Sequence, residues 1–345
     1  MWSYVLKRLL LMIPTLFGIL LLTFIVIQFV PGGPVEQMVA QLQGRDVGGE
    51  GAAAGAAAGI HGRQGLDAAQ IEQIRQLYGF DLPAHERFLQ MVGQFLRFDL
   101  GQSFFHHRSV WELIVERLPV SISLGLWTFL ISYAVSIPLG IAKAVRAGSR
   151  FDTATSVIVL VGFAIPGFVL GVALLVIFGG QLQWFPLRGL VSSNWHELSL
   201  GAQIVDYLWH ITLPVTASVV GAFAITTMLT KNALLEEIRK QYVLTARAKG
   251  LSERRVLYKH VFRNALIPIV TAFPAAFVGA FFASALLIET LFSLEGLGLL
   301  GFESVIRRDF PVVMGTLYLF ALIALVTRLI SDLCYVWVDP RVRFD

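Results

Sequence analysis

The chain has 345 residues, of which 56% are hydrophobic and only 14% are charged. An ordinary soluble domain carries about 25% charged residues, so this composition excludes such a domain and predicts an integral membrane protein. The net charge of +4 is small, and the single cysteine, Cys334, excludes an intramolecular disulfide.

Long apolar runs predict the membrane-spanning helices. A helix of about 20 residues crosses a hydrocarbon core about 30 Å thick and satisfies its own backbone groups in lipid. Five runs carry no charge, and a sixth is interrupted only by Arg328 and Asp332. We therefore predict an all-α integral membrane protein with six transmembrane helices at residues 9–30, 118–141, 153–178, 211–230, 265–288 and 312–338.

The first long connection, residues 31–117, predicts a small helical periplasmic domain. Its Gly/Ala-rich insert at about 48–65 lacks the side chains to pack a core and is expected to be disordered. Two later stretches, 71–78 and 88–95, have apolar residues at the spacing of one helix face. Such a domain would either cap the helix bundle or receive a soluble partner.

Positive charges between the spans predict the orientation. Nine lysines and arginines lie in residues 231–263, whereas one lies in 179–210 and two lie in 290–311. By the positive-inside rule, both termini are cytoplasmic, as are the 231–263 loop and the 339–345 tail. Residues 1–30 then form the cytoplasmic N-terminus and first transmembrane helix, and residues 118–338 form the core.

The sequence contains only incomplete matches to catalytic and metal-binding motifs. Two starts of the zinc-protease pattern H-E-x-x-H have Leu89 and Leu200 where the second histidine would stand. No Gly-Lys pair occurs, so the chain has no phosphate loop for a nucleotide. We expect no catalytic residue, metal site or cofactor in this chain, which leaves an intramembrane enzyme as a weaker alternative.

Three ionisable residues lie in or beside the predicted spans: Glu289, Arg328 and Asp332. Arg328 and Asp332 are four residues apart and share one helix face, which predicts a mutually neutralising structural pair. Charged residues inside a membrane are also candidates for a substrate or proton pathway. An ion-coupled carrier that uses these three residues therefore remains an alternative.

The basic 231–263 loop is predicted to contain two helices separated by a corner. Glu236 and Glu237 are placed in the first turns of the first helix, Gly250 is its left-handed exit residue, and Ser252 caps the next helix. One face of the first helix collects small or apolar residues at spacings of three and four: Leu234, Leu235, Ile238, Tyr242, Thr245 and Ala246.

The corner itself is a candidate docking surface. Small side chains let another backbone approach closely, and the flanking cations can meet acidic groups of a partner. A basic helix lying on anionic lipid and a plain solvated loop are the alternatives. Nucleic-acid binding is disfavoured because few aromatic residues lie between the cations. The candidate residues are Thr245, Ala246, Arg247, Ala248, Lys249, Gly250 and Leu251.

The segment YVLTARAKGLSERRVLYKHVFRNALIP resembles the cytoplasmic signature of permease subunits of binding-protein-dependent ABC importers, in their dipeptide/oligopeptide branch. The family pattern E-A-A-x-x-x-G aligns on Gly250, with Leu244, Thr245 and Ala246 in place of E-A-A. LYGFDLPAHERF, LWHITLPV and LLIETLFSLEGLGLLGFESVIRRDFP are similar to the same branch. PGGPVEQ and FPLRGLVSS are most similar to its Yej-type (microcin C/oligopeptide) permeases.

This resemblance implies a type I ABC importer permease fold in the bacterial inner membrane. It implies three kinds of protein partner: a second homologous permease, ATP-binding subunits that are often fused as one chain, and a periplasmic substrate-binding protein. ATP and Mg²⁺ would be held by the ATP-binding subunits, which would dock on the 245–251 loop. The 31–117 domain would help to receive the binding protein. The substrates would be oligopeptides or peptide-like compounds.

Overall fold

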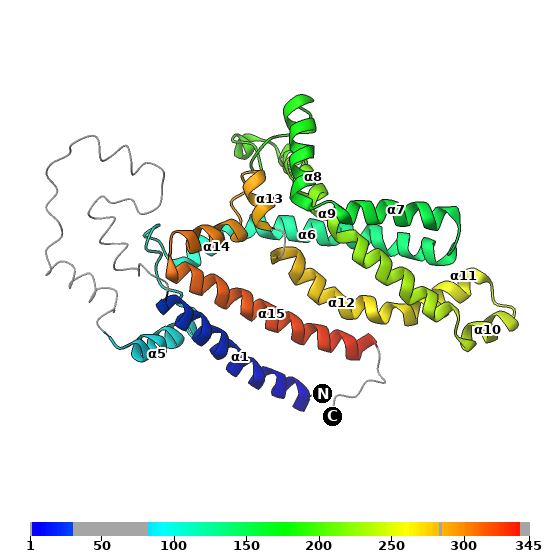
Figure 1. The fold of residues 1–345 in the computed structure, drawn as a ribbon, viewed down its shortest axis with the longest axis horizontal. Helices are drawn as coiled ribbons and strands as arrows, with labels where there is room; N and C mark the ends of the chain where they lie inside the picture. Colours follow the sequence, from blue (N-terminus) through cyan, green and yellow to red (C-terminus); the bar gives the residue numbers. More distant parts are fainter. Residues whose placement is uncertain (1, 30–81, 283–284, 339–345) are drawn as a thin grey trace. The chain divides into compact units, whose positions relative to one another are not determined.

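The computed structural model describes residues 2–29, 82–282 and 285–338, and these residues fold almost entirely into helices (Figure 1). Within them the only β-type pairing is an isolated bridge between Gln102 and Ser109. The all-α prediction is confirmed for these residues. The described residues divide into two compact units, one drawn from 2–8, 116–282, 285–300 and 323–338 and the other from 9–29, 82–115 and 301–322.

Five helices among the described residues are long and apolar enough to cross a membrane. A sixth span is formed if the bent pair of α7 and the helical segment after it counts as one crossing. The candidate spans occupy α1 (Trp2–Phe29), α6 (Val110–Val145), α9 (Leu200–Ile238), α11 to α12 (Glu253–Arg255 to Phe262–Phe282) and α15 (Phe310–Val338).

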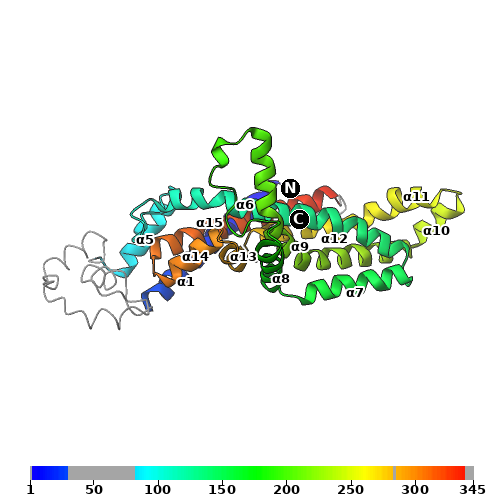
Figure 2. The same cartoon turned by 90° about the horizontal axis from the view of Figure 1, so that it is seen from above.

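The third predicted span, residues 153–178, is not one straight helix. α7 (Arg150–Ala164) ends before Ile165, and α8 (Gly167–Leu174) leaves at an angle of 90°, continuing as the π-helical segment η1 (Leu175–Gln181). Figures 1 and 2 both show α8 turned away from the line of α7. Pro166 has no N–H for helical bonding and disfavours helical backbone at Ile165, so the break falls at this pair.

The fifth predicted span, residues 265–288, is also wrong in its limits. α12 begins at Phe262 and ends at Phe282, and a separate short helix, α13 (Ala285–Leu291), follows. α12 itself continues from the π-helical segment η3 (Val256–Val261), so the membrane candidate begins at Glu253 in the basic loop. The last part of the loop, residues 253–263, and the span therefore form one continuous helical run.

α9 organises the larger unit. It has 39 residues and is therefore about 58 Å long, well beyond the roughly 30 Å of a hydrocarbon core. It packs against α7, α8 and α12. Figures 1 and 2 show α7 running beside it, with α10 (Gln241–Ala248) and α11 beyond its end. The 231–238 part of the basic loop is thus the end of α9 itself.

One hydrophobic cluster of this unit joins α6, α9 and α13. Ala217 of α9 is fully buried, and Gly167 of α8 approaches so closely that a Cβ there would lie 3.1 Å from the Ala217 carbonyl oxygen. The close contact fixes α8 against α9 just after the break at Pro166. The buried members of the cluster are Leu124, Ile211, Leu213, Val215, Ala217, Ile288, Phe292 and Leu294.

The smaller unit contains α5 (Ala84–Phe95), which confirms the predicted amphipathic stretch 88–95. Phe88 is buried, with its ring centroid 5.3 Å from those of Phe17 and Phe24 on α1. Phe95 packs against Tyr318 of α15 at 5.2 Å. The predicted helix at 71–78 and the Gly/Ala-rich insert lie outside the described residues.

Candidate functional site

The predicted left-handed corner at Gly250 is confirmed. Gly250 has a φ of +74°, in the left-handed region. Its N–H donates to the carbonyl of Arg247 (2.9 Å), and the N–H of Leu251 donates to the carbonyl of Ala246 (3.3 Å). These two bonds form the Schellman motif, which satisfies the last carbonyls of α10 and reverses the chain. α11 then begins at Glu253, although the Ser252 side chain makes no capping hydrogen bond.

The helix before the corner is shorter than predicted. α9 ends at Ile238, Lys240 has extended backbone, and α10 begins only at Gln241. Glu236 and Glu237 therefore lie in the last turn of α9, and their placement in the first turns of the loop helix is wrong. The predicted apolar face fails for the same reason, because the break separates its members onto two helices.

Ala246 faces the interior of the chain. Val243 is fully buried and Ala246 is 6% exposed. They pack in a cluster, here called the loop core, with Ala144 of α6, Leu234 of α9 and residues of the helices after the corner. The full set of buried members is Ala144, Ala233, Leu234, Val243, Ala246, Val256, Val261 and Ala265. Ala246 thus supports the loop from inside and does not present the surface expected of it.

Glu237 fixes the start of α10 to the end of α9. Its carboxylate accepts a hydrogen bond from the Tyr242 hydroxyl (2.6 Å) and pairs with the ammonium of Lys240. The hydrogen bond to Glu237 raises the pKa of Lys240, and burial raises the pKa of Tyr242 to about 12. Both side chains therefore keep their protons at neutral pH, and the link between the helices persists.

The outer face of the corner remains exposed. Thr245, Arg247, Ala248, Lys249 and Gly250 are all exposed, and Leu251 is half-buried against the loop core.

The Arg247 guanidinium reaches across the corner and donates to both oxygens of Glu253, at 2.9 and 3.0 Å. Among the described residues, Lys249 forms no ion pair. The corner offers a partner small side chains, one preset guanidinium and one lysine that is available for pairing.

Glu289 has the contacts of a structural residue. Its side chain is fully buried in α13, and its carboxylate accepts the N–H of Leu299 (2.6 Å) at the start of α14 (Leu297–Ile306). A Cβ on Gly296 would collide with this carboxylate, so glycine there makes room for it. An acid at a helix N-terminus satisfies free N–H groups and complements the helix dipole.

The predicted pairing of Arg328 with Asp332 is wrong. Asp332 forms an ion pair with the Arg8 guanidinium and accepts a hydrogen bond from the Tyr4 hydroxyl, each at 2.9 Å. Arg328 is exposed and, within the described part of the chain, forms no ion pair. Tyr4 and Arg8 are themselves one helical turn apart, 2.8 Å between hydroxyl and Nε. Asp332 is therefore bonded to partners 324 and 328 residues away on another helix and not to the neighbour four residues away.

The sequence analysis did not predict two contacts of the loop. The pairing of Arg247 with Glu253 depends on the positive φ at Gly250, which brings residues on either side of the corner together. The bond between Tyr242 and Glu237 depends on the helix break between them. The predicted corner would have indicated the first pairing; no local signal indicates the second.

Comparison with known protein families decides what kind of protein carries this loop. Residues 136–344 match the family described as the binding-protein-dependent transport system inner membrane component. The chain belongs to this family. The match includes the whole basic loop and every helix from the end of α6 onward.

The permease has full-length relatives. It is 53% identical to the peptidoglycan transport system permease protein YejB of Agrobacterium fabrum (strain C58 / ATCC 33970), covering 100% of this chain and 99% of the relative. It is 51% identical to the inner membrane ABC transporter permease protein YejB of Escherichia coli O157:H7, with 100% of both chains covered. The di/tripeptide permease DppB of Pseudomonas aeruginosa (strain UCBPP-PA14) is 32% identical, with 99% of both chains covered. These relatives confirm the predicted branch and the prediction of a transporter subunit rather than an enzyme.

The fold agrees with this assignment. A chain of the MetNI methionine ABC transporter, solved in inward-facing conformations, superposes with a TM-score of 0.51 at 19% identity. The match covers 68% of the permease and 98% of that chain. The type I ABC importer permease fold predicted from the sequence is confirmed, as is a multi-pass protein of the inner membrane.

Proposed function

We propose that this permease forms one half of a heterodimeric pathway that moves oligopeptides or peptide-like compounds from the periplasm to the cytoplasm. The observation that carries the proposal is full-length identity of 51–53% to YejB permeases, one of them named for peptidoglycan transport. More distant relatives at 31–32% identity are named for dipeptides, di/tripeptides and oligopeptides. Peptides, including those released from peptidoglycan, are therefore the substrate class to test.

In this proposal the permease receives its energy through residues 245–251. A partner subunit binds ATP and Mg²⁺, and a cleft of that subunit holds the corner at Gly250. The exposed corner supports this: it combines small residues with Lys249, and its conformation is fixed from inside by Val243 and Ala246. A helix that rests on lipid would need a free apolar face, whereas the apolar face of α10 is already covered by the loop core.

The proposal also assigns sides and partners. The two termini and the loop are cytoplasmic, as the nine basic residues of 231–263 favour. Residues 31–117 are periplasmic and help to receive a substrate-binding protein. A second, homologous permease completes the pathway, and the two ATPase domains are either separate subunits or fused in one chain.

Reconstitution in lipid vesicles tests the function directly. Vesicles contain the two permeases and the ATPase, with the binding protein and a labelled tripeptide outside. We expect accumulation of the peptide that requires ATP and the binding protein and that continues when the proton gradient is collapsed. Uptake that follows a proton gradient without ATP would instead support an ion-coupled carrier and contradict the proposal.

A further inference from the structure

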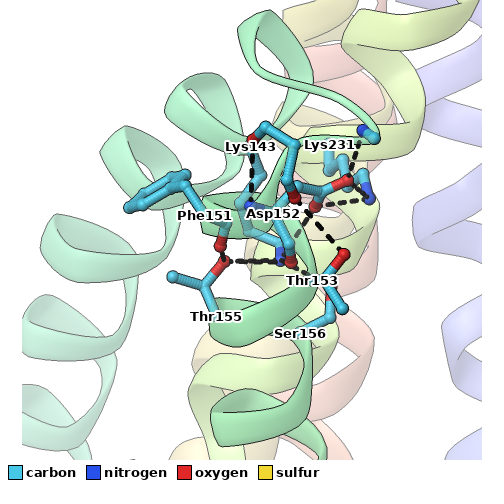
Figure 3. Close-up of polar contacts among 9 residues, drawn as sticks. Lys143, Phe151, Asp152, Thr153, Thr155, Ser156 and Lys231 are labelled. Atoms are coloured by element: carbon cyan, nitrogen blue, oxygen red, sulfur yellow. Dashed lines mark hydrogen bonds and ion pairs between the residues drawn. The ribbon is translucent and has the colours of Figure 1, made fainter.

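Three helices of the permease meet at one carboxylate. Lys143 lies in the last turn of α6, Asp152 in the first turn of α7, and Lys231 in α9, two turns before its end. Lys231 Nζ lies 2.7 and 2.8 Å from the two carboxylate oxygens of Asp152, and Lys143 Nζ lies 3.1 Å from one of them (Figure 3). These residues are called the three-helix cluster below.

Lys143 is an unusual member because its side chain is fully buried. Besides the carboxylate, its ammonium donates to the carbonyl oxygen of Asp152 (2.9 Å) and to the hydroxyls of Thr155 (2.9 Å) and Ser156 (2.7 Å). A charge buried at this depth is tolerated only where it is paired and hydrogen-bonded. The first two turns of α7 are therefore held around the end of α6.

Asp152 also fixes the turn between α6 and α7. Its N–H donates to the Ser149 hydroxyl (3.3 Å), and its carboxylate accepts the N–H of Gly148 (3.1 Å), which has a φ of +77°. This reciprocal arrangement is close to the capping box S-x-x-E. Both oxygens of Asp152 are thus shared between the turn and the two lysines, so the turn and α9 are tied to the same group.

The three-helix cluster adjoins the loop core. Ala144 follows Lys143 along α6, Leu234 is one turn beyond Lys231 along α9, and both pack with Val243 of α10. One turn toward the opposite end, α6 and α9 approach so closely that a Cβ on Gly140 would lie 2.6 Å from the Thr230 Cβ. A displacement of α10 therefore acts on helices whose relative position the cluster fixes.

We propose that the three-helix cluster is the joint through which movement of the 245–251 loop reaches α7, with Asp152 and Lys231 as positioning residues. The inference rests on the proposed function, in which a partner ATPase moves the loop. The cluster makes α9 and the α6–α7 turn move as one body. α7 leads directly to the break at Pro166, so a movement of its first turn alters the bent third span.

Lys231→Met in the complete transporter, reconstituted with its second permease, ATPase and binding protein, tests the joint. Lys231 carries the shortest bonds to Asp152, and Lys143 keeps its hydrogen bonds in this variant. We expect assembly and basal ATP hydrolysis at the wild-type level, with peptide uptake per ATP lowered by about tenfold, the size of a typical coupling between sites. Lys231→Arg keeps the positive charge that pairs with Asp152 and is expected to restore the wild-type ratio of uptake to ATP hydrolysis.

Arg150→Met is the matched control, because it removes an exposed cation from the same turn that forms no ion pair among the described residues. It is expected to keep the wild-type ratio. A wild-type ratio in Lys231→Met overturns the proposal. Asp152→Asn is the second variant; parallel loss of assembly, hydrolysis and uptake in both variants would mark a purely structural cluster and overturn it too.

The same measurements separate this inference from the proposed function. If the wild-type transporter shows no ATP-dependent peptide uptake, the proposed function fails. The proposal for the three-helix cluster is then tested by the rate of ATP hydrolysis stimulated by the binding protein. Lys231→Met must lower this rate, and Arg150→Met must leave it unchanged.

Discussion

Substitution of Gly250 tests the proposed coupling role of the corner at its most constrained residue. Gly250 adopts a φ of +74°, and a Cβ built there meets no atom within 4 Å. The cost of alanine is therefore only that of the left-handed backbone, about 1–2 kcal/mol. Proline fixes φ near −65° and removes the N–H that donates to Arg247, which costs at least about 3 kcal/mol. Asparagine tolerates the left-handed region and serves as the matched control.

The expected order of ATP-dependent peptide uptake is glycine, asparagine, alanine and then proline at position 250. A cost of about 1–2 kcal/mol lowers the population of the native corner by a factor of about 5–30 relative to its alternatives, so Gly250→Ala is expected to be partly active and Gly250→Pro inactive. The assay is uptake in reconstituted vesicles, with membrane insertion and copurification of the ATPase measured in parallel. Insertion should not change in any variant. Wild-type uptake by Gly250→Pro would refute the assigned role of the corner.

Two further pairs of variants separate the buried and exposed groups. Ala246→Trp overpacks the loop core and should lower the stability of the detergent-solubilised permease by about 1–3 kcal/mol, measured by thermal unfolding, whereas Ala248→Trp should leave stability unchanged and weaken copurification of the ATPase. Asp332→Asn should destabilise the permease by about 1–2 kcal/mol because it weakens bonds from two partners, whereas Arg328→Ala should stay within about 0.5 kcal/mol of wild type. Equal effects within either pair would contradict the contacts described.

Local signals in the sequence predicted the parts of the fold that depend on local physics. Gly250 is needed at a left-handed position, and apolar runs long enough to cross a membrane were found from hydropathy alone. The break at Pro166 was harder to predict, because Pro14 and Pro214 lie inside helices that continue through them. The difference lies in tertiary packing: Gly167 lets α8 rest against the Ala217 carbonyl, and that contact supports the turn.

Charged residues were predicted less well because their partners are distant in sequence. Arg328 and Asp332 satisfy the four-residue rule for a helix pair, yet Asp332 is bonded to Arg8. Lys231 contributed to the predicted orientation only as a positive charge, although both Lys231 and Lys143 form ion pairs with Asp152. Desolvation forces such groups to find partners, but the fold decides which partner is within reach. The S-x-x-D capping pattern at Ser149 was the one local sign of this cluster.

The buried and exposed faces of α10 affect different properties of the loop. Val243 and Ala246 set its stability through the loop core, whereas Ala248 and Lys249 are exposed and contribute nothing to that core. Arg247 differs from both the buried and the exposed residues. It is exposed, yet its hydrogen bonds to Glu253 hold the guanidinium in place before any partner binds. An exposed pair of this kind contributes less than about 1 kcal/mol to stability. The Arg247–Glu253 pair has a larger effect on docking. It already restricts the Arg247 side chain in the free permease, so less side-chain entropy would be lost when a partner binds.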